Sequence, residues 1–483
     1  MDQCRLIINN LDEDAEGGAT FTRLDPVRGD VAAIAAAASI DDACRAADAA
    51  AAAFPSWSQT GPGERRAILS RAAELLEARA DAFAATMTAE TGATQAWCRF
   101  NIALGAEILR DAAGMTTQVT GALLPSDQGA ILSMGFRQPA GVCLAVAPWN
   151  APVILGLRAI AMPLACGNSI VLKASELCPR THRLIGELMI AAGAPPGVVN
   201  LVSNAPGDAE DIVEALVAHP AVRRINFTGS TRVGRIVAQI AARHLKPCLL
   251  ELGGKAPMVV LADADLDHAV EAACFGAFFN QGQICLSTER IILVDEVADA
   301  FAERFAARAR QLKAGDPRID GLSLGPMIGR EAVQRVRGLI DDALSKGGRL
   351  LAGGTIHDSF MDATVIDDVD PRMRLYHEES FGPVAALIRV RDVEEAVTVA
   401  NDCQYGLAAC VFGRDLGRAV AVARRIDSGI CHINGATVSD DPQAPFGGVK
   451  ASGYGRFGGQ SAVDAFTELR WITVNPSRSP YPL

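Results

Sequence analysis

From Val142 onward, short runs of β-favouring apolar residues alternate with stretches of helical periodicity. The predicted strands cover residues 142–147, 169–173, 198–202, 224–227 and 248–252. The predicted helices between them cover residues 153–164, 179–192, 208–219 and 232–243. Such alternation predicts βαβ units and a parallel sheet that binds ligands beyond the carboxyl ends of its strands. The fold class is therefore α/β.

A second α/β region follows the first. Its predicted strands are 258–261 and 291–294, its predicted helices are 266–280 and 298–312, and alternation continues to Ile433. Before Val142, alanine-rich segments at 41–54 and 63–90 repeat apolar residues at helical spacing. A chain of 483 residues exceeds the size at which one hydrophobic core stops growing, so we expect two or three domains.

Charge and cysteine usage exclude several classes of protein. The chain has 45 basic and 56 acidic side chains, and a net charge of −11 repels phosphate backbones, which argues against nucleic-acid binding. Its 12 cysteines show no C-x-x-C pair and no zinc spacing, which indicates reduced thiols and no metal. The longest apolar stretch, residues 141–172, is interrupted by prolines, and the N-terminus has no apolar targeting segment. We therefore expect a soluble, cytoplasmic protein without membrane contact.

Cys285, in FFNQGQICLSTER, is a candidate nucleophile. A single cysteine in an apolar context is more often a small buried hydrophobe. Here Cys285 follows a glycine and three polar side chains, which predicts a loop whose backbone another group approaches closely. It also precedes a predicted strand.

Two further polar residues follow predicted strands. Glu251 ends the apolar run CLLE, and burying an unpaired carboxylate is costly, so it is either ion-paired, with Lys255 or an arginine, or a general base with a raised pKa. Asn150, in VAPWNAP, is either a turn residue before Ala-Pro or an amide donor for a developing oxyanion.

Several residues could bind a nucleotide. The motif FTGSTRVG places Gly229 and Gly234 between a strand and a helix, a geometry that suits a pyrophosphate, although the spacing is not G-x-G-x-x-G. Lys173 and Glu176 follow another strand of the same sheet and are either ribose ligands or ordinary surface charges.

Seven stretches together resemble the aldehyde dehydrogenase superfamily, in its order, from about residue 20 to the end of the chain: VAPWN, KASE, FTGSTRVG, LELGGK, FNQGQIC, EESFGPV and PFGGVKASGYGR. The interval from Glu251 to Cys285, 34 residues, also matches that family. Within it, RRINFTGSTRVG, STER and FTEL are most similar to bacterial salicylaldehyde and vanillin-type aromatic aldehyde dehydrogenases.

The resemblance implies specific roles. Cys285 would attack the aldehyde carbon, Asn150 would stabilise the oxyanion, and Glu251 would activate the water that releases the acid. Contacts to an NAD cofactor would come from Pro148, Trp149, Lys173, Glu176, Gly229, Ser230, Gly234, Leu252, Gly253, Glu379 and Phe381. An anionic Glu176 should repel a 2′-phosphate, which favours NAD over NADP.

The substrate pocket is expected to be apolar. Trp97, Ile284, Leu286 and Phe446 would line a slot suited to an aryl ring, although Trp97 could equally be plain core. Arg158 departs from the family pattern, in which many relatives have a lysine one place later. It could bond a ring hydroxyl, anchor an aliphatic carboxylate, or pair structurally with an acid.

The resemblance also implies domains and partners. A Rossmann-like NAD-binding domain would comprise residues 1–114 and 135–252, and an α/β catalytic domain would comprise residues 253–435. A small β oligomerisation element would comprise residues 115–134 and 466–483, and residues 436–465 would return to the NAD-binding domain. A homodimer is expected, and a tetramer is possible. The alternative functions are a succinic-semialdehyde dehydrogenase that uses Arg158 as anchor, a CoA-acylating relative, disfavoured by the presence of Glu251, and an inactive binding or structural protein on the same fold.

Overall fold

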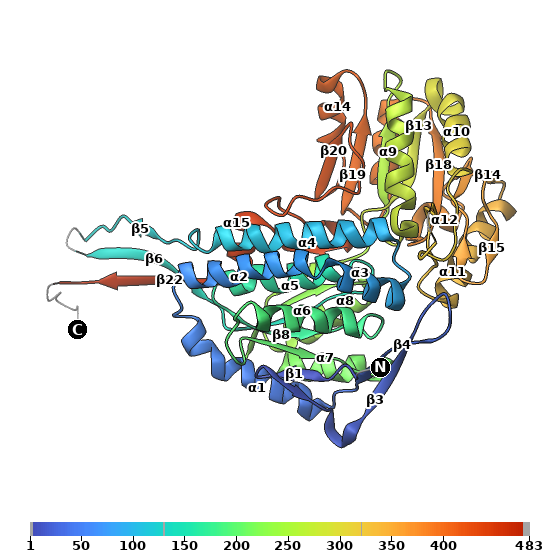
Figure 1. The fold of residues 1–483 in the computed structure, drawn as a ribbon. Coiled ribbons are helices and arrows are strands. Elements are labelled where there is room, and N and C mark those ends of the chain that lie inside the picture. Colours follow the sequence, from blue (N-terminus) through green and yellow to red (C-terminus); the bar gives the residue numbers. More distant parts are fainter. Residues whose placement is uncertain (1–2, 129–130, 320, 477–483) are drawn as a thin grey trace.

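The computed structural model describes residues 3–128, 131–319 and 321–476, and within them two large sheets form separate bodies (Figure 1). The first sheet has the order β2 (Leu11–Glu13), β1 (Leu6–Ile8), β9 (Val199–Val202), β8 (Ser169–Lys173), β7 (Val142–Val146), β10 (Val222–Thr228), β11 (Cys248–Glu251) and β21 (Gly453–Tyr454). Strands β9, β8, β7, β10 and β11 are parallel neighbours. The five strands predicted between residues 142 and 252 are therefore confirmed.

The register of the first sheet brings the ends of its strands together. Val146 lies opposite Lys173, and Thr228 lies opposite Glu251. Because these strands are parallel, the polar residues that follow them gather along one edge of the sheet.

Helices cover both faces of this sheet. They are α1 (Ile40–Trp57), α5 (Pro152–Ala165), α6 (Pro179–Ala191), α7 (Ala209–Ala218) and α8 (Thr231–Arg243). Every residue of α5 is buried, which explains its apolar sequence on all sides. It packs against two N-terminal helices, α2 (Pro62–Ala78) and α4 (Gln95–Met115), and α3 (Ala80–Thr91) packs on α4 and α6. The helical segment expected at 63–90 is interrupted at Arg79, whose φ and ψ of −105° and 18° are not helical.

The second sheet has the order β14 (Arg349–Ala352), β17 (Thr364–Asp367), β18 (Val384–Val390), β13 (Thr288–Val294), β12 (Ala256–Val260), β19 (Ala408–Phe412) and β20 (Ile430–Ile433). Its helices are α9 (Leu266–Phe278), α10 (Asp295–Ala309), α11 (Arg330–Ser345), α12 (Arg374–His377), α13 (Val393–Asn401) and α14 (Leu416–Ala423). Two predicted elements begin three residues earlier than expected. The helix predicted at 298–312 begins earlier, because Asp295 and Glu296 favour a helix N-terminus, and the strand predicted at 291–294 begins at Thr288.

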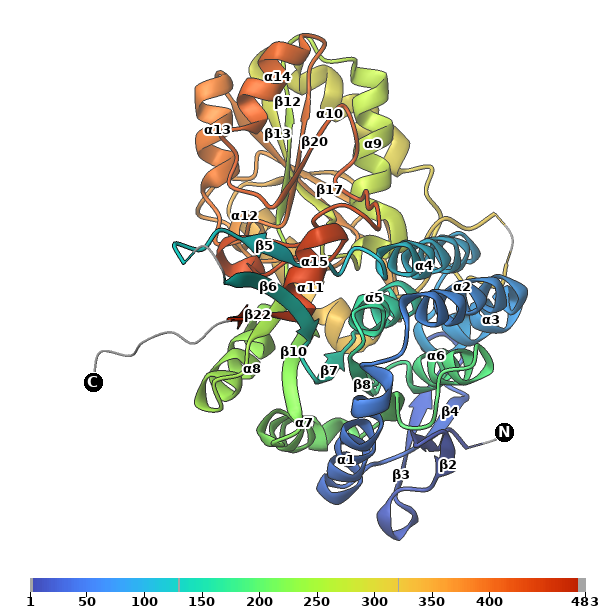
Figure 2. The same cartoon turned by 90° about the vertical axis from the view of Figure 1, so that its left-hand side faces the viewer.

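A third, smaller sheet projects from the body of the molecule (Figures 1 and 2). It has the order β22 (Thr467–Val474), β6 (Leu132–Pro139) and β5 (Ala122–Leu124), and helix α15 (Gly459–Phe466) leads into it. Large apolar side chains are exposed on it: Leu123, Leu124, Leu132, Phe136, Leu469, Trp471 and Val474. Residues 129–130 and 477–483, which we assigned to the oligomerisation element, lie outside the described residues.

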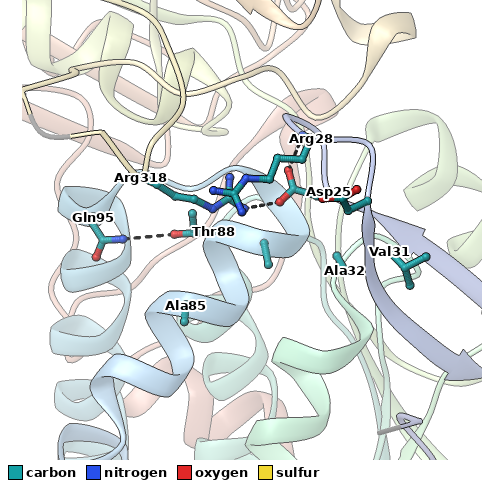
Figure 3. Close-up of a pocket in the computed structure, with 10 residues that line it drawn as sticks. Asp25, Arg28, Val31, Ala32, Ala85, Thr88, Gln95 and Arg318 are labelled. Carbon is teal, nitrogen blue, oxygen red and sulfur yellow. Dashed lines mark hydrogen bonds and ion pairs between the residues drawn. The ribbon is translucent and has the colours of Figure 1, made fainter. Parts of the chain in front are cut away.

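The hairpin β3 (Thr20–Leu24) and β4 (Val31–Ala36) reaches the second body through its turn. Figure 3 shows the cavity at this contact, where Arg318 binds Asp25. Arg318 and Arg28 also lie 3.0 and 4.0 Å from Asp316. These ion pairs tie the N-terminal segment to the body of the second sheet.

Across the described ranges, no helix combines the length and apolarity that crossing a bilayer would require. Nor do three His, Cys, Asp or Glu side chains come together there in a way that would hold a metal ion. None of the 12 cysteines, all of which are described, forms a disulfide.

Candidate active site

Glu251 is the last residue of β11 and is 1% exposed. Within the described residues, neither oxygen of its carboxylate has a hydrogen-bond partner of ordinary geometry. Burial raises the pKa of Glu251 to about 8, and the positive charge of Arg158 and a contact with the Cys285 thiol oppose this rise only in part. The ion pair with Lys255 that we considered is absent, because Lys255 binds Glu289 instead.

The loop before Cys285 is held in an uncommon conformation. A short 3₁₀ turn, Phe279–Gly282, follows α9, and Asn280 and Gln281 in it have φ values of 48° and 56°. Asn280 Nδ2 donates to the carbonyl of Asn150 at 3.1 Å, and Gln281 Nε2 donates to that of Pro326 at 3.0 Å. The side chains of Asn280 and Gln281 therefore tie this loop to neighbouring segments. These contacts stabilise its left-handed backbone conformation.

Cys285 is half-buried beside Glu251. A Cβ atom at Gly254 would lie 2.1 Å from the carbonyl oxygen of Cys285, so only glycine permits this close approach. Burial raises the pKa of the Cys285 thiol, and the negative charges of Glu251 and Glu379 raise it further, whereas Arg158 opposes them. The thiol therefore needs a neighbouring proton acceptor in order to become a nucleophile.

Asn150 follows β7 and is 7% exposed. Its Nδ2 donates to the carbonyl of Gln283 at 3.0 Å, and its own carbonyl accepts from Trp97 Nε1 at 2.8 Å. Asn150 is thus fixed from both sides next to the Cys285 loop, with its side-chain amide at the wall of the cavity.

Cys285, Glu251 and Asn150 all line one cavity of about 360 Å³. It is also lined by Pro148, Trp149, Leu155, Thr228, Gly229, Ser230, Leu252, Gly253, Arg335, Glu379 and Phe381. A neighbouring cavity of about 490 Å³ shares Pro148, Trp149, Thr228, Gly229 and Ser230 with it and extends to Lys173 and Glu176. The two cavities together form an elongated space that runs from the strand ends to Cys285.

This space fits a dinucleotide. Lys173 and Glu176 form an ion pair of 3.2 Å at one end, where ribose hydroxyls could bind both charges. At the middle, Ser230 caps α8 and the helix N-terminus faces the cavity, a position that favours a pyrophosphate. Gly234 does not line the cavity. A Cβ atom there would lie 2.4 Å from Leu252, so this glycine permits close packing of α8 instead.

The 378–382 loop closes the end of the space near Cys285. Glu379 Oε1 accepts from the amide of Gly254 at 2.8 Å, and the Phe381 ring meets the Trp149 ring edge-on at 5.9 Å. Burial and the charge of Glu289 raise the pKa of Glu379 to about 7. Arg335 of α11 donates to the Glu379 carbonyl at 2.9 Å. Sequence reasoning missed Arg335, because an arginine on an amphipathic helix carries no signal of its own.

Arg158 is paired with an acid that we did not predict. Its Nη2 lies 2.6 Å from Asp440 Oδ2, both side chains are less than a tenth exposed, and its guanidinium lies 4.3 Å above the Phe446 ring. The other nitrogen, Nη1, and the other oxygen, Oδ1 of Asp440, are buried and have no partner among the described residues. No sequence signal links residues 158 and 440.

The remaining predicted pocket residues lie in one apolar cluster. Ile284, Leu286, Phe446 and Trp97 are each at most 6% exposed, and Cys285 packs against this cluster. Trp97 stacks on Phe100 and meets Phe279 edge-on, with ring centres 5.4 and 5.0 Å apart. Trp97 therefore contacts Asn150 and two phenylalanine rings, and it is not among the residues that line the cavity with Cys285.

Comparison with known proteins gives a consistent result. Residues 13–472 match the model of the aldehyde dehydrogenase family. The chain is 55% identical to vanillin dehydrogenase of Pseudomonas fluorescens, over 99% of both chains. It superposes on the salicylaldehyde dehydrogenase of Pseudomonas putida G7, solved with salicylaldehyde, with a TM-score of 0.98, 46% identity and 99% coverage of each chain. The succinate-semialdehyde dehydrogenase of Burkholderia pseudomallei is 37% identical, with a TM-score of 0.94 and 98% coverage of each chain.

Proposed function

Because the chain belongs to the aldehyde dehydrogenase family, we propose that it oxidises aromatic aldehydes to carboxylic acids with NAD. The observation that carries this proposal is the convergence of Cys285, Glu251 and Asn150 on one cavity, continuous with a space that fits a dinucleotide. A thiol, a carboxylate with a raised pKa and an amide donor are the three groups that an aldehyde oxidation through a thioester requires.

In the first half-reaction, the Cys285 sulfur forms a bond to the aldehyde carbon. Glu251 is the neighbouring group that can take the thiol proton. Its pKa of about 8 lies near neutral pH, so the carboxylate can both take up and release a proton there. The carbonyl oxygen becomes an oxyanion, which the side-chain amide of Asn150 and the backbone amide of Cys285 stabilise. Glu379 and Phe381 would hold the nicotinamide half of NAD beside Cys285, where the bound cofactor would accept the hydride that leaves the same carbon, and the loss of that hydride leaves a thioester on Cys285.

Between the two half-reactions, Glu251 releases the thiol proton to solvent. In the second half-reaction, Glu251 takes a proton from water and later returns it to the Cys285 sulfur. The water oxygen bonds to the thioester carbon, the carbon–sulfur bond breaks, and the Cys285 sulfur leaves with its electron pair and is reprotonated. The carboxylic acid is then released. A buried carboxylate without a hydrogen-bond partner of ordinary geometry among the described residues suits this role, because burial raises its pKa more than the charge of Arg158 lowers it.

Glu176 favours NAD over NADP. It stands at the ribose end of the space as an anion, which repels a 2′-phosphate. Arg232 lines the same cavity and acts in the opposite sense, so the measured ratio of kcat/KM with the two cofactors decides between them. We expect NAD to be preferred.

The pair of Arg158 and Asp440 favours a ring that carries a hydroxyl group. Nη1 of Arg158 and Oδ1 of Asp440 are buried without a partner among the described residues, and neither residue lines the cavity that contains Cys285. A phenolic hydroxyl that reached them would accept from Nη1 and donate to Oδ1, which would satisfy both atoms at once. A carboxylate could accept from Nη1 but would meet the anionic Asp440, and this argues against a short semialdehyde substrate. The ion pair is the structural role that we considered for Arg158, and it leaves one donor and one acceptor for a ligand.

We also propose the predicted domains and a homodimer in a reducing cytoplasm. Exposed apolar side chains on the three-stranded sheet support burial against a second copy, and the free cysteines fit a reducing compartment. Light scattering of the purified protein should give twice the mass of the chain, and a monomer at micromolar concentration would contradict the dimer.

The experiment that tests the function is NADH formation by the purified protein with vanillin, salicylaldehyde or benzaldehyde. We expect NADH and the corresponding acid in equal amounts. A protein that binds NAD but forms no NADH with any aldehyde would instead be a binding protein on this fold.

A further inference from the structure

Lys255 and Glu289 form a buried ion pair close to the candidate base, Glu251, and the candidate nucleophile, Cys285. Lys255 follows Glu251 by four residues, Glu289 follows Cys285 by four, and Lys255 Nζ lies 2.6 Å from Glu289 Oε2. Both side chains are at most 3% exposed. Their ion pair therefore links the segment that leaves the base to the segment that leaves the nucleophile.

Glu289 also binds the 378–382 loop. Its two carboxylate oxygens accept from the amide of Ser380 at 2.8 and 3.1 Å, and Oε1 accepts from the amide of Phe381 at 3.1 Å. Phe381 has a φ of 45°, a left-handed conformation that a bulky residue adopts only when its surroundings hold it there. The buried carboxylate supplies that constraint.

The loop in turn carries the two residues nearest the end of the cofactor space. Glu379 and Phe381 flank Ser380, and both line the cavity that contains Cys285. Glu289 itself is not among the lining residues of that cavity. Its contacts with Lys255, Ser380 and Phe381 join the base segment, the nucleophile segment and the cofactor loop at one carboxylate.

We propose that Glu289, held by Lys255, is a positioning residue that fixes the 378–382 loop for the nicotinamide half of the cofactor. The proposal rests on the proposed function, since it assumes that a nicotinamide cofactor binds there. Glu289 acts through the backbone of Ser380 and Phe381, so its loss should weaken cofactor binding more than it slows the chemical step.

The neighbouring charged residues have separate roles. Arg290 donates instead to the carbonyls of Val399 and Ala400 at the end of α13. Glu378 belongs to the loop but points to solvent, where it pairs with Arg374 at 2.8 Å. Glu378→Gln is therefore a matched control: the same substitution, in the loop, outside the Glu289 contacts.

The test compares wild type, Glu289→Gln and Glu378→Gln without aldehyde. Hydrogen exchange of the peptide containing Ser380 and Phe381, measured by mass spectrometry without cofactor, should accelerate about tenfold in Glu289→Gln. The Kd for NAD, from tryptophan fluorescence, should rise about tenfold, and KM for NAD should rise more than kcat falls. Glu378→Gln should match wild type in all of these.

A folded Glu289→Gln with wild-type exchange and a wild-type Kd overturns the proposal. If that variant does not fold, Glu289→Asp keeps the charge for Lys255 but is one methylene shorter, and it must change exchange and Kd in the same direction. A folded Glu289→Asp that behaves as wild type also overturns it. Failure of the proposed function looks different: wild type then forms no NADH from aromatic aldehydes, whatever the loop does.

Discussion

Glu251 and Glu289 are both buried in the same part of the molecule, yet their surroundings differ. Glu289 has a lysine 2.6 Å away and accepts from two backbone amides, whereas Glu251 has no hydrogen-bond partner of ordinary geometry among the described residues. The pKa of Glu251 accordingly rises to about 8 through burial. A buried charge that is fully compensated fixes the framework, and one that is left uncompensated can exchange its proton near neutral pH.

The largest effect is expected at the nucleophile beside Glu251. Cys285→Ala should lower turnover by at least about 10⁴-fold, because no thioester forms without the sulfur. The Kd for NAD should stay close to that of wild type, since Cys285 lies at one end of the space. Cys431→Ala, at another half-buried cysteine, is the matched control and should retain activity. Retained turnover in Cys285→Ala would remove this mechanism.

Removing the cation that pairs with Glu289 should mainly lower the free energy of unfolding. Lys255→Met leaves the Glu289 carboxylate buried without its cation, so we expect a loss of about 4 kcal/mol in the free energy of unfolding. Chemical denaturation measures this directly. A loss below about 1 kcal/mol, typical of a surface pair, would mean that the pair does not hold the framework.

Glu251→Gln should slow the reaction, and it should raise the stability of the folded protein rather than lower it as Lys255→Met does. We expect kcat to fall about a hundredfold, with a slow burst of about one NADH per site before a stall, because deacylation lacks its base. In wild type, kcat should rise with pH through about 8, as Glu251 loses its proton, and the variant should lose this rise.

The stability of Glu251→Gln has a definite sign. The folded pKa, about 8, exceeds the ordinary value of 4.5, so wild type loses stability as pH rises between these two values. The glutamine variant should therefore melt at the same temperature as wild type near pH 4, and at a higher temperature at pH 9. A lower melting temperature at pH 9 would mean that a partner compensates Glu251 after all.

A smaller effect is expected at Arg158 and Asp440. They are ion-paired, as Glu289 is, and they also have buried polar atoms without a partner among the described residues, as Glu251 does. Their ion pair compensates two charges, yet Nη1 of Arg158 and Oδ1 of Asp440 have no partner in the part of the chain that the structure describes. Asp440→Asn should lower kcat/KM for vanillin or salicylaldehyde about tenfold relative to benzaldehyde, which has no hydroxyl group to bind. An equal loss for all three aldehydes would assign the pair to the framework alone.

The sequence carried the fold well because the periodicities in it are local. The strands that end near Lys173, Thr228 and Glu251 were predicted from short β-favouring runs, and the structure has them within about two residues. The break at Arg79 and the early start of α10 were missed, because several helical residues on either side gave no sharp boundary signal.

The candidate site was predictable only in part. Cys285, Glu251 and Asn150 stand in distinctive local contexts, a polar glycine loop and two strand ends, and the structure brings them to one cavity. Asp440 and Arg335 have no such context. The partner of Lys255 could not be chosen from sequence either, since Glu251 is near in the chain and Glu289 is near in space.

The most direct test of the account is the ratio of kcat/KM for aromatic aldehydes to that for succinic semialdehyde, measured by NADH absorbance with the wild-type protein. The apolar cluster against which Cys285 packs and the ion pair of Arg158 with Asp440 predict a ratio of at least about ten, roughly 1.4 kcal/mol, in favour of vanillin, salicylaldehyde or benzaldehyde. A higher kcat/KM for succinic semialdehyde would contradict the aromatic assignment and make Arg158 a carboxylate anchor.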